Sequence, residues 1–324
     1  MKVLILGANG QLGIELQKAF SVYGEIVALG RDQCDLSQPG QLRQSVTNAT
    51  PDIILSAAAY TAVDRAESEP ELAMRVNGEA PGVLAEEAKK LGALLVHYST
   101  DYVFDGAKPS PWVEEDITGP LNVYGATKLK GEQNIAQAGD RYLIFRTSWV
   151  VSPHGNNFVK TMLRLGRERD QLRIVNDQTG APTSASAIAQ ATRQVLEKPS
   201  DASHSGVYHM TCAGQTTWCG FAQAIFARAQ PPQDKKWPSV TGIPGAEYPT
   251  PAKRPGNSVL SNAKLHSRFN VQLPAWEAAL EETLRGLGVY AVKPLFAKTS
   301  RKALIPKENL RQKVGAGFLG IRYT

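Results

Sequence analysis

The run KVLILGANGQLG, residues 2–13, sets the expectation for the fold. Its apolar residues 2–6 predict a buried strand, and residues 11–20 have the spacing of an amphipathic helix. Between them lie Gly7, Gly10 and Gly13. Glycine permits a tight turn there and lets a diphosphate approach the free N–H groups at the helix start. The spacing is GxxGxxG rather than GxGxxG, so its position directly after the first strand carries the prediction: a nucleotide site formed by these glycines with Gln11 and Leu12.

The same alternation continues through the first 150 residues. Apolar runs predict further strands at 25–29, 52–58, 93–99 and 142–148, and helical patterns occupy 38–48, 70–91 and 122–138. Strands that alternate with helices form parallel βαβ units, and strands without polar alternation are buried on both faces. The pattern predicts an α/β fold in which residues 1–148 form a dinucleotide-binding domain, a Rossmann-type doubly wound parallel sheet.

Beyond Trp149 the pattern is less regular. It predicts a helix at 157–169, strands at 172–177 and 206–211, and two last helices after proline-rich segments. The two strands could each return to the main sheet. We expect residues 149–171 and 212–292 to form a smaller, loop-rich region that binds the substrate.

Composition and charge limit the classes of protein to which the chain can belong. It has 324 residues, of which 42% are hydrophobic and 20% charged, as is typical of globular proteins. The net charge of +6 comes from residues 293–324, which hold eight Lys and Arg against one acidic residue. Residues 1–292 hold 28 basic and 29 acidic side chains. We interpret 293–324 as a flexible basic tail and predict neither a nucleic-acid nor a membrane partner.

Other features argue against secretion, membrane insertion and metal chemistry. The N-terminal run breaks at Gly7, too early for a secretory signal, and no apolar run reaches membrane-spanning length. The three cysteines lack a CxxC spacing and the five histidines include no HExxH pair, so we predict neither a disulfide framework nor a metal site. We expect a cytoplasmic protein that acts as a monomer or homodimer.

The end of the second strand indicates which cofactor is used. A carboxylate is usual there because it binds the ribose hydroxyls of NADH, but this chain has Gly30 and Arg31. An arginine at this place accepts the 2′-phosphate of NADPH. Asp35 and Leu36 follow, where the adenine ring would lie. We therefore predict NADPH as the preferred cofactor, with weaker use of NADH.

Polar residues suited to catalysis follow at the end of the fourth strand and on the next helix. Thr100 and Asp101 emerge where ligands of open α/β sheets bind. Tyr124 and Lys128 are four residues apart and so share one helix face. A nearby ammonium lowers the pKa of a phenol, which makes the phenol a usable general acid. The pair alone fits a surface helix as well, but its place after the glycine turn and the strand end favours catalysis.

Together these segments resemble the extended short-chain dehydrogenase/reductase family, and within it the subfamily of dTDP-4-dehydrorhamnose reductases. The similar runs, in that subfamily's order, are GANGQLG, AAAYTAVDRAESEP, NVYGATKLKGE, FRTSWV, GNNF and NDQTGAPT. They lie within roughly residues 1–290 and leave out the basic tail. The resemblance implies an NADPH-dependent reduction of the C4 keto group of dTDP-4-dehydrorhamnose, which gives dTDP-L-rhamnose for cell-surface polysaccharide synthesis.

The resemblance also implies roles for individual residues. Tyr124 protonates the developing alkoxide, Lys128 lowers the pKa of Tyr124 and contacts the nicotinamide ribose, and Thr100 polarises the keto group. Room for the cofactor backbone is left by Ala57, Ala58 and Ala59.

Contacts with the nucleotide sugar are implied for a further set, Asp101, Trp149, Asn157 and Arg254, with Arg254 on the diphosphate. Trp149 fits a core position and Asn157 a helix cap equally well. Some relatives join subunits through acidic residues and a divalent metal; here Glu15 is present, but Ser186 stands where a second acid is expected.

Two other interpretations stay open. The same fold and residues could serve another nucleotide-sugar reductase, or an epimerase that returns the hydride. The chain could also be a non-catalytic NADP-binding regulatory subunit resembling that of methionine adenosyltransferase.

Overall fold

A computed structural model describes residues 1–198 and 202–291 of the chain. Residues 1–291 form one compact unit. The predicted basic tail, residues 293–324, lies outside the described residues.

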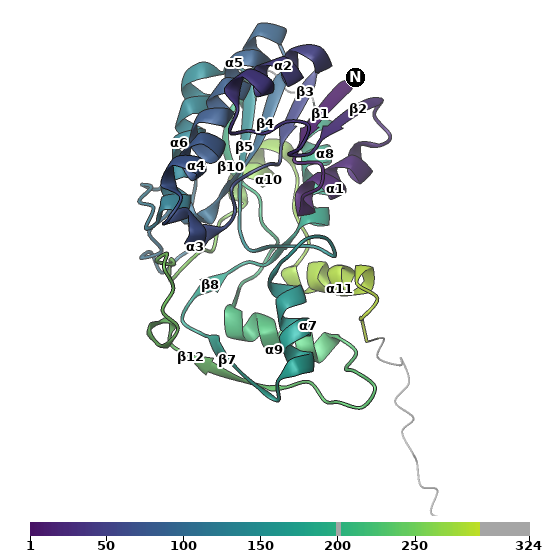
Figure 1. The fold of residues 1–324 in the computed structure, drawn as a ribbon, viewed down its shortest axis with the longest axis vertical. Helices are drawn as coiled ribbons and strands as arrows, with labels where there is room; N and C mark the ends of the chain where they lie inside the picture. The colour runs from purple at the N-terminus through teal and green to yellow at the C-terminus, as the bar shows by residue number, and fades with distance from the viewer. Residues whose placement is uncertain (199–201, 292–324) are drawn as a thin grey trace, which may run out of the picture. The chain divides into compact units, whose positions relative to one another are not determined.

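The centre of the fold is a parallel six-stranded sheet in the order β10-β5-β4-β3-β1-β2 (Figure 1). The strands are β1 (Lys2–Leu6), β2 (Glu25–Leu29), β3 (Ile53–Ser56), β4 (Leu94–Thr100), β5 (Tyr142–Thr147) and β10 (Gly206–His209). The five strands expected in the first 150 residues are confirmed, each within two residues at either end. The order turns back between β1 and β3, so the predicted doubly wound α/β fold is confirmed as well.

Helices cover both faces of this sheet, as Figure 1 shows. One face carries α2 (Pro39–Ala49), α5 (Ala80–Leu91) and α6 (Val123–Ala138), and the other carries α1 (Gln11–Phe20) and α8 (Ala185–Leu196). The first strand shows why its sequence is apolar throughout. Val3 and Ile5 belong to the core on the α1 side, whereas Leu4 and Leu6 belong to the core on the α2 side.

The helix expected at 70–91 is interrupted. It consists of α4 (Pro70–Met74), a π-helical turn η1 (Arg75–Glu79) and α5, and a short helix α3 (Val63–Ala66) precedes it. π-helical turns are rare and often lie at functional sites. Here the turn carries Asn77, whose side chain is buried.

Besides α8, the described part of the second half of the chain holds further helices and several short strands. The helices are α7 (Phe158–Glu168), α9 (Trp218–Arg228), α10 (Ala263–Phe269) and α11 (Trp276–Gly286). Two-residue strands pair β6 (Val150–Val151) with β9 (Thr183–Ser184), and β8 (Thr179–Gly180) with β11 (Thr216–Thr217). Short 3₁₀ turns in this half are η3 (Ala202–His204) and η4 (Gly245–Glu247); a further one, η2 (Asp101–Val103), directly follows β4.

The two strands that could return to the main sheet behave differently. Residues 206–209 do return, as β10 beside β5. The strand expected at 172–177 does not: β7 (Gln171–Val175) pairs with β12 (Ser239–Ile243) in a separate ribbon, so that possibility was wrong. The physical reason lies in its burial. Gln171 and Arg173 are exposed, whereas the strands inside the main sheet are covered on both faces.

Candidate active site

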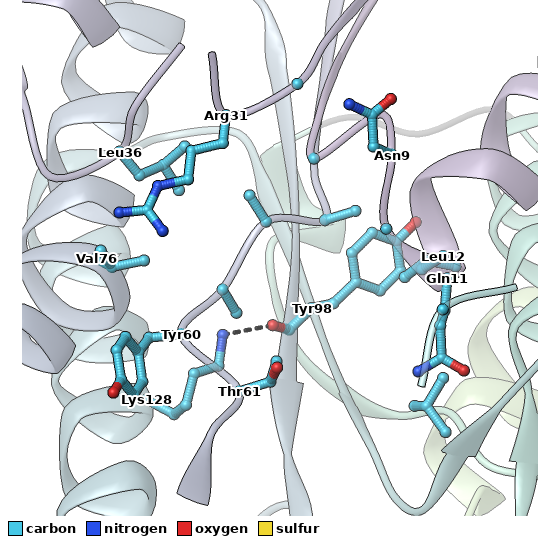
Figure 2. Close-up of a pocket in the computed structure, with 18 of the residues that line it drawn as sticks. Asn9, Gln11, Leu12, Arg31, Leu36, Tyr60, Thr61, Val76, Tyr98 and Lys128 are labelled. Atoms are coloured by element: carbon cyan, nitrogen blue, oxygen red, sulfur yellow. Dashed lines mark hydrogen bonds between the residues drawn. The ribbon is translucent and has the colours of Figure 1, made fainter. Parts of the chain in front are cut away.

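A cavity of about 580 Å³ lies at the carboxyl ends of the central strands. Figure 2 shows Arg31 and Leu36 on one side of it and Asn9, Gln11 and Leu12 on the other, with Lys128 nearby. Of the residues expected around the cofactor, those that line it are Gly7, Gly10, Gln11, Leu12, Arg31, Asp35, Leu36, Ala57, Ala58, Ala59, Tyr124 and Lys128. The structure thus gathers these residues from four separate stretches of sequence around one space.

The glycine turn has the shape that its sequence predicts. Gly7 has φ +86°, a conformation that disfavours other residues, and a Cβ there would lie 2.8 Å from the Ala58 nitrogen. Gly13 does not line the cavity but packs α1 against the turn, because a Cβ on it would lie 2.0 Å from the Gly7 oxygen. No side chain caps the start of α1 at Gly10. Its first N–H groups therefore remain available to a diphosphate, which fits a bound dinucleotide.

Arg31 stands at the mouth of the cavity as a solvent-accessible cation. Its side chain is 77% exposed, and its Nε lies 3.8 Å from the Asp35 carboxylate, at the outer limit of an ion pair. Such a contact contributes little free energy, so the guanidinium can turn to another anion. The wall behind it is apolar, with Leu36 buried and Val76 close by (Figure 2).

Tyr124 reaches the cavity from the first turn of α6. Asn122 caps this helix by accepting a hydrogen bond of 2.8 Å from the Gly125 nitrogen. Burial raises the pKa of the Tyr124 phenol to about 12; the Thr100 hydroxyl lowers it in part, and the charge of Asp101 adds to the rise. The expected lowering by Lys128 is not found: the influences on the pKa of this phenol are desolvation, which is the largest, Thr100 and Asp101, and Lys128 is not among them. At neutral pH Tyr124 is protonated.

Lys128 is 1% exposed, and its ammonium group is held from the sheet. Nζ donates to the Tyr98 carbonyl at 2.7 Å, the dashed line in Figure 2, and to His97 Nε2 at 2.9 Å. Burial lowers the pKa of Lys128 to about 8, against the opposing charge of Glu132. At neutral pH the lysine is therefore mostly charged, and it loses its proton at a lower pH than an exposed lysine would.

Thr100 and Asp101 lie together at the end of β4, outside the lining of the cavity. The Thr100 hydroxyl donates to Asp101 Oδ1 at 3.0 Å and accepts from the Tyr102 nitrogen at 3.2 Å. Burial raises the pKa of Asp101 to about 6. Because the Thr100 hydroxyl has one proton, it must turn from Asp101 before it can donate to a carbonyl.

The remaining residues expected at the sugar nucleotide also lie outside the cavity lining, and each has protein partners. Arg254 forms a forked ion pair with Asp64, with N–O distances of 3.0 and 2.8 Å. Trp149 has φ +47° and stacks on Trp218, their ring centroids 3.5 Å apart. Nothing in the sequence indicated that Trp218 would be the residue stacked on Trp149.

Asn157 is accounted for as a structural residue. Its Oδ1 accepts from the Lys160 nitrogen at the start of α7, which is the cap alternative. Its Nδ2 donates to the Ser152 carbonyl and, at 2.8 Å, to Gln11 Oε1. The amide is thus engaged with α7 and Gln11 in this structure, and direct contact of Asn157 with the substrate stays a prediction. The adjacent Asn156 lines the cavity.

Asn77, which the sequence did not single out, links the loop after β3 to helix α6. The Tyr60 nitrogen donates to Asn77 Oδ1 at 2.8 Å, and Asn77 Nδ2 donates back to the Tyr60 carbonyl at 3.0 Å. The same Nδ2 lies 3.3 Å from the Thr127 hydroxyl on α6. The loop after β3 is thereby fixed to the helix that carries Tyr124. Only the poor helix propensity of asparagine within 70–91 could have indicated this.

Glu15, the acidic residue considered for a metal bridge between subunits, contacts basic side chains of its own chain. Glu15 Oε1 accepts from Lys18 at 2.9 Å and lies 3.0 Å from His154 Nε2, and Ser186 donates to Glu282. Among residues 1–198 and 202–291 no group of three or more His, Cys, Asp or Glu is arranged to hold a metal ion. In the same part of the chain, no helix is long and apolar enough to cross a membrane.

The doubly wound sheet, with a glycine turn and a tyrosine–lysine pair that line one cavity, defines an oxidoreductase of the extended short-chain dehydrogenase/reductase class. Residues 1–288 match the sequence model of a protein family, the RmlD substrate binding domain. The chain belongs to this family.

Two curated relatives are dTDP-4-dehydrorhamnose reductases. That of Burkholderia thailandensis is 52% identical and that of Escherichia coli K12 is 44% identical; each alignment covers 89% of this chain, and 99% and 98% of the relatives. A solved dTDP-4-dehydrorhamnose reductase from Bacillus anthracis, in complex with NADP, is 36% identical with a TM-score of 0.81 and covers 88% of this chain and 98% of that one. The subfamily indicated by the sequence motifs is confirmed.

Proposed function

We propose that this protein reduces the C4 keto group of dTDP-4-dehydrorhamnose to give dTDP-L-rhamnose, with NADPH as the reductant. The observation that carries the proposal is that Tyr124 and Lys128 line the same cavity as the glycine turn. A proton donor and a cofactor site are thus adjacent. The identity of the chain to dTDP-4-dehydrorhamnose reductases over nearly their full length supports the choice of sugar.

The residues present fit NADPH. Gly7 and Gly10 leave space for the diphosphate, and the start of α1, which no side chain caps, offers it N–H groups. Ala57 and Ala58 leave space at the end of β3, and Arg31 offers its cation to the 2′-phosphate. NADPH supplies a hydride when bound. The Bacillus anthracis relative has NADP in its structure.

Tyr124 acts as the general acid. Because burial holds the pKa of Tyr124 at about 12, the phenol carries its proton at neutral pH, as the reduction of a ketone requires. When the alkoxide takes that proton a phenolate is left behind, and Lys128, one turn further along α6, would supply the positive charge that stabilises it once the site is filled. The Thr100 hydroxyl turns from Asp101 to the keto oxygen, which positions and polarises it.

Two residues of the second half are proposed to hold the sugar nucleotide. Arg254 has the planar fork that suits a diphosphate, and its present partner Asp64 shows that it takes a two-point anionic contact. Substrate would exchange one such contact for another. Trp149 offers an aromatic face near the sugar. We retain residues 149–171 and 212–292 as the region that forms most of the substrate site.

The experiment that tests this proposal is a substrate panel. The purified protein is incubated with NADPH and several 4-keto nucleotide sugars, and the loss of NADPH absorbance is followed. Rapid oxidation with dTDP-4-dehydrorhamnose and slow oxidation with the others supports the assignment. A different preferred sugar would support another reductase, and no oxidation with any of them would support an epimerase or a regulatory subunit.

We further propose that the protein works in the cytoplasm, where NADPH and nucleotide sugars are present, with no nucleic-acid or membrane partner. A monomer or a homodimer is expected. Light scattering of the purified protein, with and without a chelator, distinguishes these states and tests for a metal-bridged dimer.

A further inference from the structure

Lys128 depends on two acceptors that come from the same strand. Its side chain is buried, and an ammonium group removed from water is stable only where acceptors replace the water. The Tyr98 carbonyl is one acceptor, at 2.7 Å. The other is the ring nitrogen Nε2 of His97, at 2.9 Å.

The tautomer of His97 follows from its neighbours. An ammonium only donates hydrogen bonds, so Nε2 must carry the lone pair and the ring proton must be on Nδ1. Nδ1 lies 3.3 Å from the Ser56 hydroxyl at the end of β3. Both side chains are 1% exposed. Burial, and then the charge of Lys128, keep the pKa of His97 well below its ordinary value of 6.5, so the ring is neutral.

The backbone fixes this ring in place. His97 lies inside β4, where it is in register with Ser56 of β3 and Ile144 of β5, both parallel neighbours. Two residues on along β4, Ser99 also faces α6, where it contacts Glu132. The ring of His97 therefore projects from a rigid, doubly hydrogen-bonded strand toward the helix that carries Lys128.

We propose that His97 is a positioning residue for the reduction: its neutral ring accepts a hydrogen bond from Lys128 and keeps the charged ammonium in the cavity wall near Tyr124. The inference rests on the proposed function, because it assigns Lys128 a part in that reaction. A histidine that only filled space in the sheet would leave Lys128 equally well held by the Tyr98 carbonyl.

Other groups around Lys128 do not replace this contact. On its own helix, Glu132 is the acidic neighbour, but that carboxylate is bound to Arg146 of β5 at 2.7 Å, with both side chains 5% exposed. Tyr124, also on α6, is neutral. From β4, only His97 and the Tyr98 carbonyl face the ammonium with hydrogen-bond acceptors among the described contacts.

The kinetic test compares His97→Leu with His97→Gln. Leucine removes the acceptor at similar volume, whereas the amide oxygen of glutamine can replace Nε2. We expect kcat of His97→Leu to fall by roughly 10-fold to 100-fold with a smaller change in KM for the sugar, the scale of a misplaced catalytic group. We expect His97→Gln to recover most of kcat.

The pH profile separates positioning from packing. Activity should decline as the pH rises through the pKa of Lys128, about 8. Without the His97 acceptor the charged form is less stable, so in His97→Leu the decline should begin ~1 pH unit lower, the shift expected for one lost charge-assisted hydrogen bond. The matched control is His209→Gln, which replaces another buried histidine of the same sheet that contacts the Trp112 carbonyl. Its profile should match that of the unaltered protein.

A measurement on the cofactor-free protein is independent of activity. Long-range ¹H–¹⁵N spectra of the histidine rings, with His97 assigned by its loss in His97→Gln, should show a protonated Nδ1, a bare Nε2 and no titration between pH 8 and 5.5. Substituting Lys128→Met should shift the Nε2 resonance. A protonated Nε2, or a ring that titrates near pH 6.5, overturns the proposal.

The two proposals fail in different ways. If no nucleotide sugar is reduced, the proposed function fails while the ring spectra still decide whether His97 accepts from Lys128. If the sugar is reduced but His97→Leu keeps the kcat and pH profile of the unaltered protein, the positioning role is wrong. Should His97→Leu fail to fold, the ring spectra and the profile of His97→Gln give the decision.

Discussion

Removing the guanidinium of Arg31 should reduce the preference for NADPH over NADH. In Arg31→Ala the glycine turn and the catalytic residues should be unchanged, because the side chain is 77% exposed and its ion pair with Asp35 is long, at 3.8 Å. What is lost is the cation next to the place of the 2′-phosphate. We expect kcat/KM for NADPH to fall while that for NADH stays within about twofold, an estimate from the small effect of exposed substitutions.

The size of the effect follows from the exposure of the residue. A charge-assisted hydrogen bond contributes about 1.5–3 kcal/mol. The solvent around Arg31 favours the lower end, and giving up the long contact with Asp35 costs almost nothing because exposed pairs contribute about 0–1 kcal/mol. A net 1.5 kcal/mol corresponds to roughly a tenfold change in the NADPH/NADH ratio. Most of it should appear in KM, since the phosphate is far from the reacting carbon.

The assay is steady-state kinetics with both cofactors at saturating sugar, at low and at moderate salt. The control is Arg164→Ala, which removes an arginine of similar exposure, 62%, that pairs with Glu168 on α7. That variant should leave the ratio unchanged. An unaltered protein that prefers NADH, or a ratio that is the same in Arg31→Ala, would refute the reasoning.

Three further substitutions test other parts of the site and fold. Tyr124→Phe should keep the NADPH dissociation constant, measured by fluorescence, and lower turnover by ~10² or more; near-normal turnover would remove its role as the acid. Gly7→Ala should lower the free energy of unfolding by about 2 kcal/mol or more, because φ is +86° and the new Cβ would lie 2.8 Å from Ala58; an unchanged thermal midpoint would contradict this. Burial holds the pKa of His209 at about 3, below its unfolded value of about 6.5, so its contribution to stability is complete above pH 6.5 and is lost as the pH falls. Urea titrations from pH 7 to 5 should therefore show a decline that is shallower in His209→Gln by about 1.4 kcal/mol per pH unit, and parallel curves would disprove the assignment.

The main sheet could be predicted because its local and global signals agree. Residues 2–6 are apolar at every position, and the structure uses both faces of that strand, with Val3 on one side and Leu4 on the other. The conformation of Gly7 likewise follows from the turn chemistry that its position requires. Such features depend on a few adjacent residues, which the sequence displays directly.

The interrupted helix and the separate ribbon could not be predicted in this way. The partner of β7 lies at Ser239–Ile243, more than 60 residues further along the chain, and no local pattern indicates that pairing. The π-helical turn at Arg75–Glu79 extends a helical pattern without changing its period visibly. The turn carries Asn77, whose hydrogen bond with the Tyr60 nitrogen joins residues 17 apart in the chain, and no local period indicates that contact.

In the site, residue types were predictable and their electrostatics were not. Tyr124 and Lys128 could be placed on one helix face from their spacing alone. The direction of the Tyr124 pKa shift could not, because desolvation depends on the depth of the finished cavity. The partner of Lys128 likewise depends on the register that brings His97 beneath α6.

The most direct test of the central claim follows a labelled hydride. The protein is supplied with dTDP-4-dehydrorhamnose and with NADPH in which both hydrogens at C4 of the nicotinamide are deuterium, and the product is analysed by NMR and mass spectrometry. We predict dTDP-L-rhamnose with one deuterium at C4 of the sugar and one NADPH consumed for each product molecule. A product without deuterium at C4, or conversion of the sugar without net consumption of NADPH, would contradict the assignment of this protein as a reductase.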